Sequence, residues 1–269
     1  MAKHDIKSCN GVERSQMKKS CVITFCDKNY LSKAEQTIKE LRTCGQYNDT
    51  IVLMVGDDLK HYEINDSNII VKYFPTIDRT DVLKRLNGIS TFDGRDFNKP
   101  FQWHKIYTFH DYFRQWNSCM LVDGGMKIYN PIQKLLNLNC TNSFLAHSDA
   151  YPTYEWKLSG QFESDRFKNL YDELSSLYNL NVDYFQSGMY LFDTCLIEDQ
   201  TINRLLELGN RYINTRTNEQ AIMNILFNCD KKVWKQIQIN DDRLHYYDCM
   251  ERNGLNCKNY IMLKMPQTT

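Results

Sequence analysis

The chain has 269 residues with 33 basic and 33 acidic side chains, and 42% of its residues are apolar. This length is enough for one large domain with a buried core, and the composition excludes a chain that is disordered throughout. A net charge of zero argues against a general nucleic-acid-binding protein, which normally carries an excess of Lys and Arg.

The sequence shows neither a membrane-spanning segment nor an export signal. Its apolar runs all fall well short of the roughly 20 residues that a bilayer helix needs. Residues 1–19 are polar and mixed in charge, which predicts a flexible leader before a domain at 20–269. The ten cysteines form no Cys-x-x-Cys pair, so we expect most of them to be reduced and buried in a cytoplasmic protein.

Apolar runs that read as strands alternate with segments that read as helices. Short runs rich in β-branched residues predict buried strands at 21–26, 51–55, 69–71, 118–122, 144–146 and 188–192. Apolar residues at helical spacing predict helices from Ser32 to near Gly45 and over 101–113, 166–178, 202–212 and 218–227. The order predicts an α/β fold whose mostly parallel sheet is flanked by helices, with ligands at the carboxyl ends of the strands.

Two of these helices begin with residues that favour capping. Ser32 is followed three residues later by Glu35, which is the pattern of a capping box. Asn218 is a good N-cap, and Glu219 suits the positive end of the helix dipole. The same pair also fits a functional alternative, in which polar side chains project from the helix start into a cleft.

Three short segments could carry chemistry. Asp123 leaves the end of an apolar strand, followed by Gly124 and Gly125; a carboxylate there suits Mg²⁺ or Mn²⁺ held together with phosphates, although an ordinary turn explains it equally well. Gln186 and Ser187 precede another strand. Because no Gly-x-Gly-x-x-Gly or Gly-x-x-x-x-Gly-Lys-Ser/Thr segment occurs, a dinucleotide fold and a P-loop enzyme are disfavoured.

Taken in order, these segments resemble the GT-A glycosyltransferases and are most similar to the retaining family-8 enzymes, such as glycogenin and bacterial galactosyltransferases. The resemblance covers residues 20 to about 230, and the matching segments are Val22-Ile23-Thr24, Lys105 ahead of the strand that ends at Asp123, Ala146-His147-Ser148-Asp149, Phe185-Gln186-Ser187-Gly188 and Glu219-Gln220-Ala221-Ile222-Met223-Asn224. It implies a single Rossmann-like GT-A domain that transfers a sugar from a nucleotide-sugar donor, UDP-linked, with retention of configuration.

The resemblance also implies a role for each candidate site residue. The nucleotide would be lined by Thr24, Phe25 and Tyr30, and its diphosphate would be faced by Lys105 and Lys264. A Mn²⁺ or Mg²⁺ ion would be bound by Asp123, with His245 and Asp248 as further candidates. The donor sugar would be surrounded by Asp149, Gln186, Glu219 and Gln220. Glu219 would stabilise positive charge at the reacting carbon, with Gln220 as the neutral alternative.

One departure from the family pattern concerns the metal. Gly125 stands where the family's Asp-x-Asp has its second acid. Either another group supplies the missing ligand, or the metal binds weakly, or the site is inactive. The main alternative is therefore a catalytically inactive GT-A-like protein that binds a glycan or a nucleotide sugar. A nucleotidyltransferase is disfavoured, because no Gly-rich basic loop follows the first strand.

The expected partners follow from the same resemblance. They are a nucleotide sugar and an acceptor that is a glycan, a protein or a lipid. A second copy of the chain, in a homodimer, is a separate expectation. The aromatic segment at 151–157 fits an acceptor-binding loop and an ordinary core patch equally well. The sequence names neither the sugar nor the acceptor.

Overall fold

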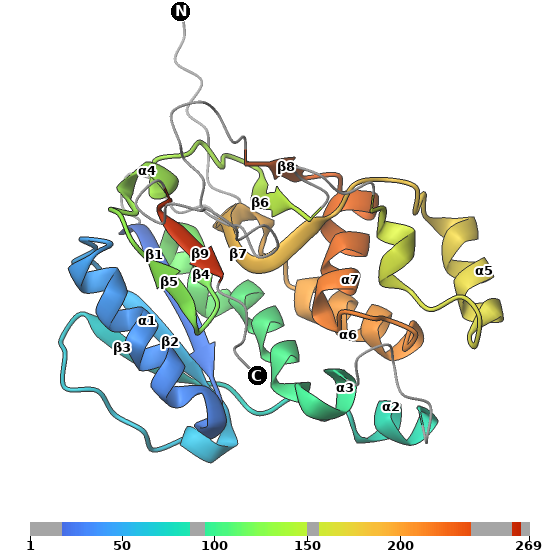
Figure 1. The fold of residues 1–269 in the computed structure, drawn as a ribbon, viewed down its shortest axis with the longest axis horizontal. Coiled ribbons are helices and arrows are strands. Elements are labelled where there is room, and N and C mark those ends of the chain that lie inside the picture. The colour runs from blue at the N-terminus through green and yellow to red at the C-terminus, as the bar shows by residue number, and fades with distance from the viewer. Residues whose placement is uncertain (1–17, 87–94, 150–155, 238–259, 265–269) are drawn as a thin grey trace, which may run out of the picture.

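A computed structural model describes residues 18–86, 95–149, 156–237 and 260–264. Its centre is a seven-stranded sheet in the order β3-β2-β1-β4-β7-β6-β8 (Figure 1). The strands are β1 (Lys18–Cys26), β2 (Ile51–Val55), β3 (Ile69–Tyr73), β4 (Trp116–Val122), β6 (Phe144–Ser148), β7 (Phe185–Asp193) and β8 (Trp234–Gln236). In this sheet β7 runs antiparallel to β4 and β6, and the other pairings are parallel, which confirms the expected mostly parallel α/β architecture.

The first strand begins earlier than the sequence predicted. Lys18 pairs with Trp116 of β4, so the last two residues of the expected leader already belong to the sheet. Along β2 every side chain is buried, because helices cover both faces of the parallel strands. Burial on both faces also explains why these strands read as continuous apolar runs.

Two hydrophobic cores lie on opposite faces of the sheet. One is covered by α1 (Leu31–Thr43) and by a two-stranded ribbon of β5 (Met126–Ile128) and β9 (Met262–Lys264). The other is covered by α6 (Thr201–Arg211), α7 (Glu219–Asn224) and the 3₁₀ helix η4 (Pro100–Phe109). The shorter helices are α2 (Thr80–Arg85), α3 (Arg95–Asn98), α4 (Gln133–Leu136) and α5 (Lys168–Leu177).

The start of α1 differs from the predicted capping box. A 3₁₀ turn, η2 (Lys28–Tyr30), leads into the helix, and the side chain of Asp27 accepts a hydrogen bond from the Tyr30 N–H. The cap therefore precedes the helix by one short turn, and the prediction at Ser32 is wrong. Asp27 takes over the capping role because it sits at the end of β1, where the chain must turn.

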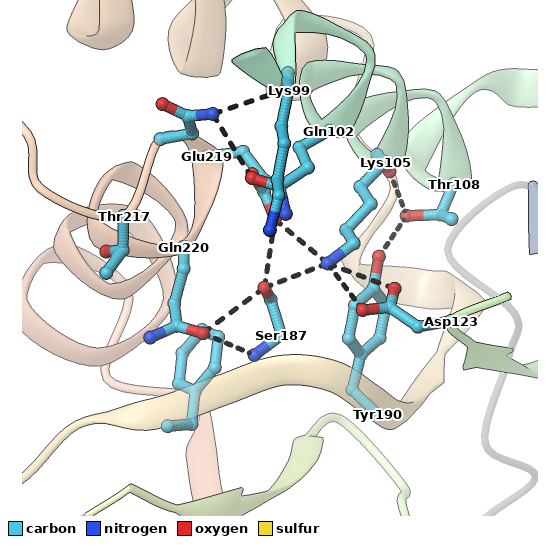
Figure 2. A network of polar contacts seen from close by, with 12 residues as sticks. Lys99, Gln102, Lys105, Thr108, Asp123, Ser187, Tyr190, Thr217, Glu219 and Gln220 are labelled. Atoms are coloured by element: carbon cyan, nitrogen blue, oxygen red, sulfur yellow. Dashed lines mark hydrogen bonds and ion pairs between the residues drawn. The ribbon is translucent and has the colours of Figure 1, made fainter. Parts of the chain in front are cut away.

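The predicted α-helix over 101–113 is instead a pair of 3₁₀ helices, η4 and η5 (Asp111–Gln115). Since a 3₁₀ helix has three residues per turn, side chains at i and i+3 lie in line. One row packs into the core and consists of Trp103, Ile106 and Phe109. A second row is aromatic: Phe101 stacks on His104, and His104 meets Tyr107 edge to face. A third, which we call the polar row, consists of Lys99, Gln102, Lys105 and Thr108 (Figure 2).

The last helices also depart from expectation. In α5 Leu174 is fully buried but Leu177 is 60% exposed, so its apolar stripe is only partly core. The predicted helix at 218–227 is α7 continued by a π-helix, η8 (Ile225–Asp230). In the described parts of the chain, no helix has the length and apolar character to cross a bilayer.

Candidate active site

A buried polar cluster lies at the carboxyl end of β4, with the Lys105 ammonium at its centre (Figure 2). The ammonium is 3.0 Å from Oδ1 of Asp123 and 3.0 Å from Oε1 of Glu219. It lies 3.1 Å from Oγ of Ser187, and that hydroxyl donates to Oε1 of Glu219 at 2.9 Å. Four side chains from four different segments thus share one network, which we call the Lys105 cluster.

The sheet topology explains how these segments meet. Asp123 follows directly after β4, and its N–H donates to the carbonyl of Gly188 in β7 at 2.9 Å. Because β7 runs antiparallel to β4, it begins at the edge where β4 ends, and Ser187 therefore lies beside Asp123. Lys105 reaches in from the polar row of η4, and Glu219 from the first turn of α7.

The electrostatics of the cluster are balanced by close pairing. Burial by itself would lower the pKa of Lys105, but the charges of Asp123 and Glu219 and the hydrogen bonds with them raise it above its usual value. Lys105 therefore stays a cation at neutral pH. Buried ion pairs of this kind add little net stability, since desolvation offsets their attraction. The presence of such a pair at the carboxyl end of a strand favours a functional explanation.

The two carboxylate oxygens of Glu219 differ in their hydrogen bonding. Its Oε1 contacts both Lys105 and Ser187, whereas the buried Oε2 has no hydrogen-bond partner among the described residues. An unsatisfied buried acceptor costs roughly 1–3 kcal/mol, more for a charged group. A ligand hydroxyl that donates a hydrogen bond to Oε2 would remove this cost.

The carboxamide of Gln220 is held in one orientation. Its Oε1 accepts from the Ser187 N–H at 3.0 Å, and its Nε2 donates to Oε1 of Gln161 at 3.3 Å. Gln161 also accepts from the Thr217 hydroxyl at 2.6 Å. Sequence reasoning missed Gln161, since no motif marks it and its partners are 56 and 59 residues away.

Asn218 joins the polar row to α7 and does not cap the helix. Its backbone has φ of +51°, and its Nδ2 donates to the carbonyl of Lys99 and to Oε1 of Gln102. Asn218 therefore stands at the predicted N-cap position, but its side chain makes no capping hydrogen bond and instead contacts residues 116 to 119 positions away. This contact fixes η4 against the start of the helix that carries Glu219.

The other predicted site residues have varied positions. Gln186 donates to Asp149, so these two form a pair beside Ser187. Phe25 lies under Lys105, with the ammonium 5.6 Å from the ring centroid. Thr24 is fully buried, and Tyr30 is half-buried at the turn after β1. His245 and Asp248 lie outside the described residues, as does most of the aromatic segment at 151–157.

The described residues do not fit a divalent cation. Asp123 is flanked by two ammonium groups, since Lys264 of β9 lies 3.5 Å from its Oδ2 in addition to Lys105. Gly125 offers no carboxylate, and within the described ranges no group of three His, Cys, Asp or Glu side chains could hold a metal. Mg²⁺ and Mn²⁺ prefer carboxylate and phosphate oxygens, so this donor set is too poor in anions.

Comparison with known proteins supports the fold. Solved structures match at low sequence identity. The galactosyltransferase LgtC, in complex with donor and acceptor sugar analogs, is 11% identical with a TM-score of 0.55, over 84% of this chain and 75% of LgtC. GlyE, a glycosyltransferase of Streptococcus pneumoniae, is 14% identical with a TM-score of 0.50, over 82% of this chain and 46% of its own. The chain has the GT-A glycosyltransferase fold.

An active-site mutant of LgtC matches at a TM-score of 0.57 and 10% identity, over 91% of this chain and 87% of its own. No family model and no curated protein sequence matches the chain. The fold expected from the family-8 resemblance is therefore confirmed by structure.

Proposed function

We propose that this protein is a glycosyltransferase that moves a sugar from a nucleotide-sugar donor to an acceptor hydroxyl. The observation that carries the proposal is the Lys105 cluster at the carboxyl end of β4, the edge at which α/β sheets bind ligands. LgtC, a galactosyltransferase with the same fold, supports the reaction class. The donor we propose is UDP-linked, and the transfer retains the configuration, as the family resemblance implies.

The cluster suits a leaving group with negative charge. Lys264 is 43% exposed and reaches Asp123 from β9, so its ammonium is available to a diphosphate at the mouth of the site. A compact cation placed beside a departing phosphate stabilises the charge that develops in the transition state. Lys105, deeper in the cluster, faces the side where the sugar would be bound.

In the proposed reaction the bond between the anomeric carbon and the diphosphate oxygen breaks, and its electron pair leaves with the nucleoside diphosphate. The acceptor oxygen forms a new bond to that carbon on the same face, and its proton goes to the departing phosphate. The transition state has oxocarbenium character, as in other glycosyl chemistry. The negative charge of Glu219 stabilises it, and its spare Oε2 accepts a hydrogen bond from a donor-sugar hydroxyl.

We assign Gln220 a positioning role next to this carboxylate, because both ends of its carboxamide are already bound by Ser187 and Gln161. Glu219 therefore remains the group for the reacting carbon. A second candidate function is binding of a nucleotide sugar or glycan without turnover. It is favoured by Gly125 and by the pairing of Asp123 with two lysines.

The test is release of nucleoside diphosphate from a panel of UDP- and GDP-sugars, with and without simple glycan acceptors. We expect one donor to be turned over above the protein-free rate. Glu219→Gln should lower this rate at least about tenfold and leave UDP affinity nearly unchanged, because the substitution removes charge where only the transition state is positive. The matched control is Glu207→Gln on the exposed face of α6, which should keep full activity.

Two results would count against the proposal. UDP binding without turnover of any donor would support the binding protein. Turnover unchanged in Glu219→Gln would remove Glu219 from the mechanism, provided that the variant shows the same thermal unfolding as the parent.

A further inference from the structure

A lysine side chain lies beside the position of the missing acid. Gly125 has φ of +97°, a conformation that strains any residue with a Cβ, and its N–H donates to the Thr37 hydroxyl at 2.9 Å. A Cβ built on Gly125 would meet Cδ of Lys33 at 3.7 Å. The aliphatic chain of an α1 lysine therefore lies in van der Waals contact with the place where a second acidic side chain would begin.

The one remaining acid of this turn is already paired. Lys105 contacts both oxygens of Asp123, at 3.0 and 3.2 Å, from the buried side. Lys264 approaches Oδ2 at 3.5 Å from the open side, because β9 places it opposite Met126 of β5. A cation bound to Asp123 would have to share this carboxylate with two ammonium groups.

The charges around Asp123 favour an anionic ligand over a cation. Two ammonium groups, those of Lys105 and Lys264, contact the single carboxylate of Asp123, and Lys105 also contacts Glu219. The ammonium of Lys33 lies nearby on α1, over the ring of Tyr30. A divalent cation at Asp123 would be repelled by these two ammonium groups, whereas a diphosphate would be attracted to the half-exposed ammonium of Lys264. Lysine is an effective phosphate ligand as a point charge.

We propose that the protein binds the donor diphosphate through lysine ammonium groups in place of a divalent cation, and that Asp123 anchors these lysines. Lys264 moves from Asp123 to the diphosphate, Lys33 covers its outer side, and Lys105 stays between the two carboxylates. The inference rests on the proposed function for the identity of the ligand. It assigns a different role to the aspartate that the family resemblance would make a metal ligand.

The test is calorimetric titration of the full chain with UDP, once in EDTA and once in millimolar MnCl₂. We expect the two dissociation constants to agree within about twofold. Lys264→Met should weaken UDP binding in EDTA about tenfold, since it removes a charge-assisted hydrogen bond to the diphosphate. Lys33→Met should weaken it about threefold. Lys168→Met, which removes an exposed ammonium from α5, is the matched control and should change nothing.

Binding that tightens tenfold or more with Mn²⁺ would overturn the inference, and so would Lys264→Met and Lys33→Met variants that bind UDP like the parent. Failure of the proposed function looks different, because it would show as metal-independent UDP binding that depends on these lysines without turnover of any donor. If UDP, GDP and ADP all fail to bind in either buffer, the inference is wrong.

Discussion

Removal of the Lys105 ammonium should lower the free energy of unfolding strongly. Lys105→Met keeps most of the side-chain volume and deletes the charge that two buried carboxylates share. Removing one partner of a buried ion pair costs about 3–5 kcal/mol of folding free energy, because the other charge stays buried without compensation. Lys264 still faces Asp123, so most of the cost should fall on Glu219.

A double-mutant cycle tests whether the cost of Lys105→Met falls mainly on Glu219. Glu219→Gln in the Lys105→Met background removes the uncompensated charge, so the double variant should be more stable than the sum of the single changes predicts, by about 2 kcal/mol. The assay is urea unfolding followed by circular dichroism, with the free energy of unfolding extrapolated to water. Lys168→Met, at an exposed pair with Asp172, is the control and should cost less than about 1 kcal/mol.

The pH dependence gives the same experiment a second readout. Since the folded state raises the pKa of Lys105 above its usual 10.5, the stabilisation is fully present below that pH and is lost only as the pH rises through the folded value. The difference in unfolding free energy between the parent and Lys105→Met should therefore stay constant over alkaline pH up to about 10. A cost below about 1 kcal/mol, or a cycle without coupling, would refute the cluster as an electrostatic unit.

Three further substitutions have expected outcomes. Burial lowers the pKa of His104 to about 4, so the unfolded chain binds a proton at a higher pH than the folded chain does. The free energy of unfolding should therefore fall by about 3 kcal/mol between pH 6.5 and 4. His104→Phe should abolish this contribution to the pH dependence of unfolding. Gly209→Ala should destabilise by about 1–3 kcal/mol in urea unfolding, because a Cβ there would lie 2.5 Å from the Trp103 ring and this clash outweighs the better helix propensity of Ala; an increase in stability would contradict the packing. Gln161→Ala removes the partner of Gln220 Nε2 and leaves only the hydrogen bond from the Ser187 N–H; it should lower kcat about tenfold with UDP affinity unchanged, and an equal kcat would exclude the positioning role.

The sheet could be predicted because its strands are buried on both faces. Residues 51–55 were expected as a strand and form β2 with the same bounds, since a parallel strand between helices reads as an unbroken apolar run. The helix at 101–113 was harder, because Trp103, Ile106 and Phe109 are spaced by three and fit an α-helix as well as a 3₁₀ helix. The signal that distinguishes them is the polar row, which repeats strictly every third residue from Lys99.

Helix-capping rules gave wrong predictions where a tertiary contact takes up the side chain that would cap the helix. Asn218 is a good cap by composition, but its amide is bound to the main chain of Lys99. The site residues implied by the family resemblance, Lys105, Asp123 and Glu219, do come together in the structure. Gln161 could not be found, because only the folded chain brings it to Gln220.

The central claim is that the diphosphate of a nucleotide sugar binds beside the Lys105 cluster, at the ammonium of Lys264. A crystal structure of the full chain with UDP tests it most directly. The account predicts phosphate oxygens within hydrogen-bond distance of Lys264 Nζ, above the carboxyl end of β4 and next to Asp123. A nucleotide bound elsewhere, for example in the surface pocket formed by Tyr62, Tyr73 and their neighbours on β3, would contradict it.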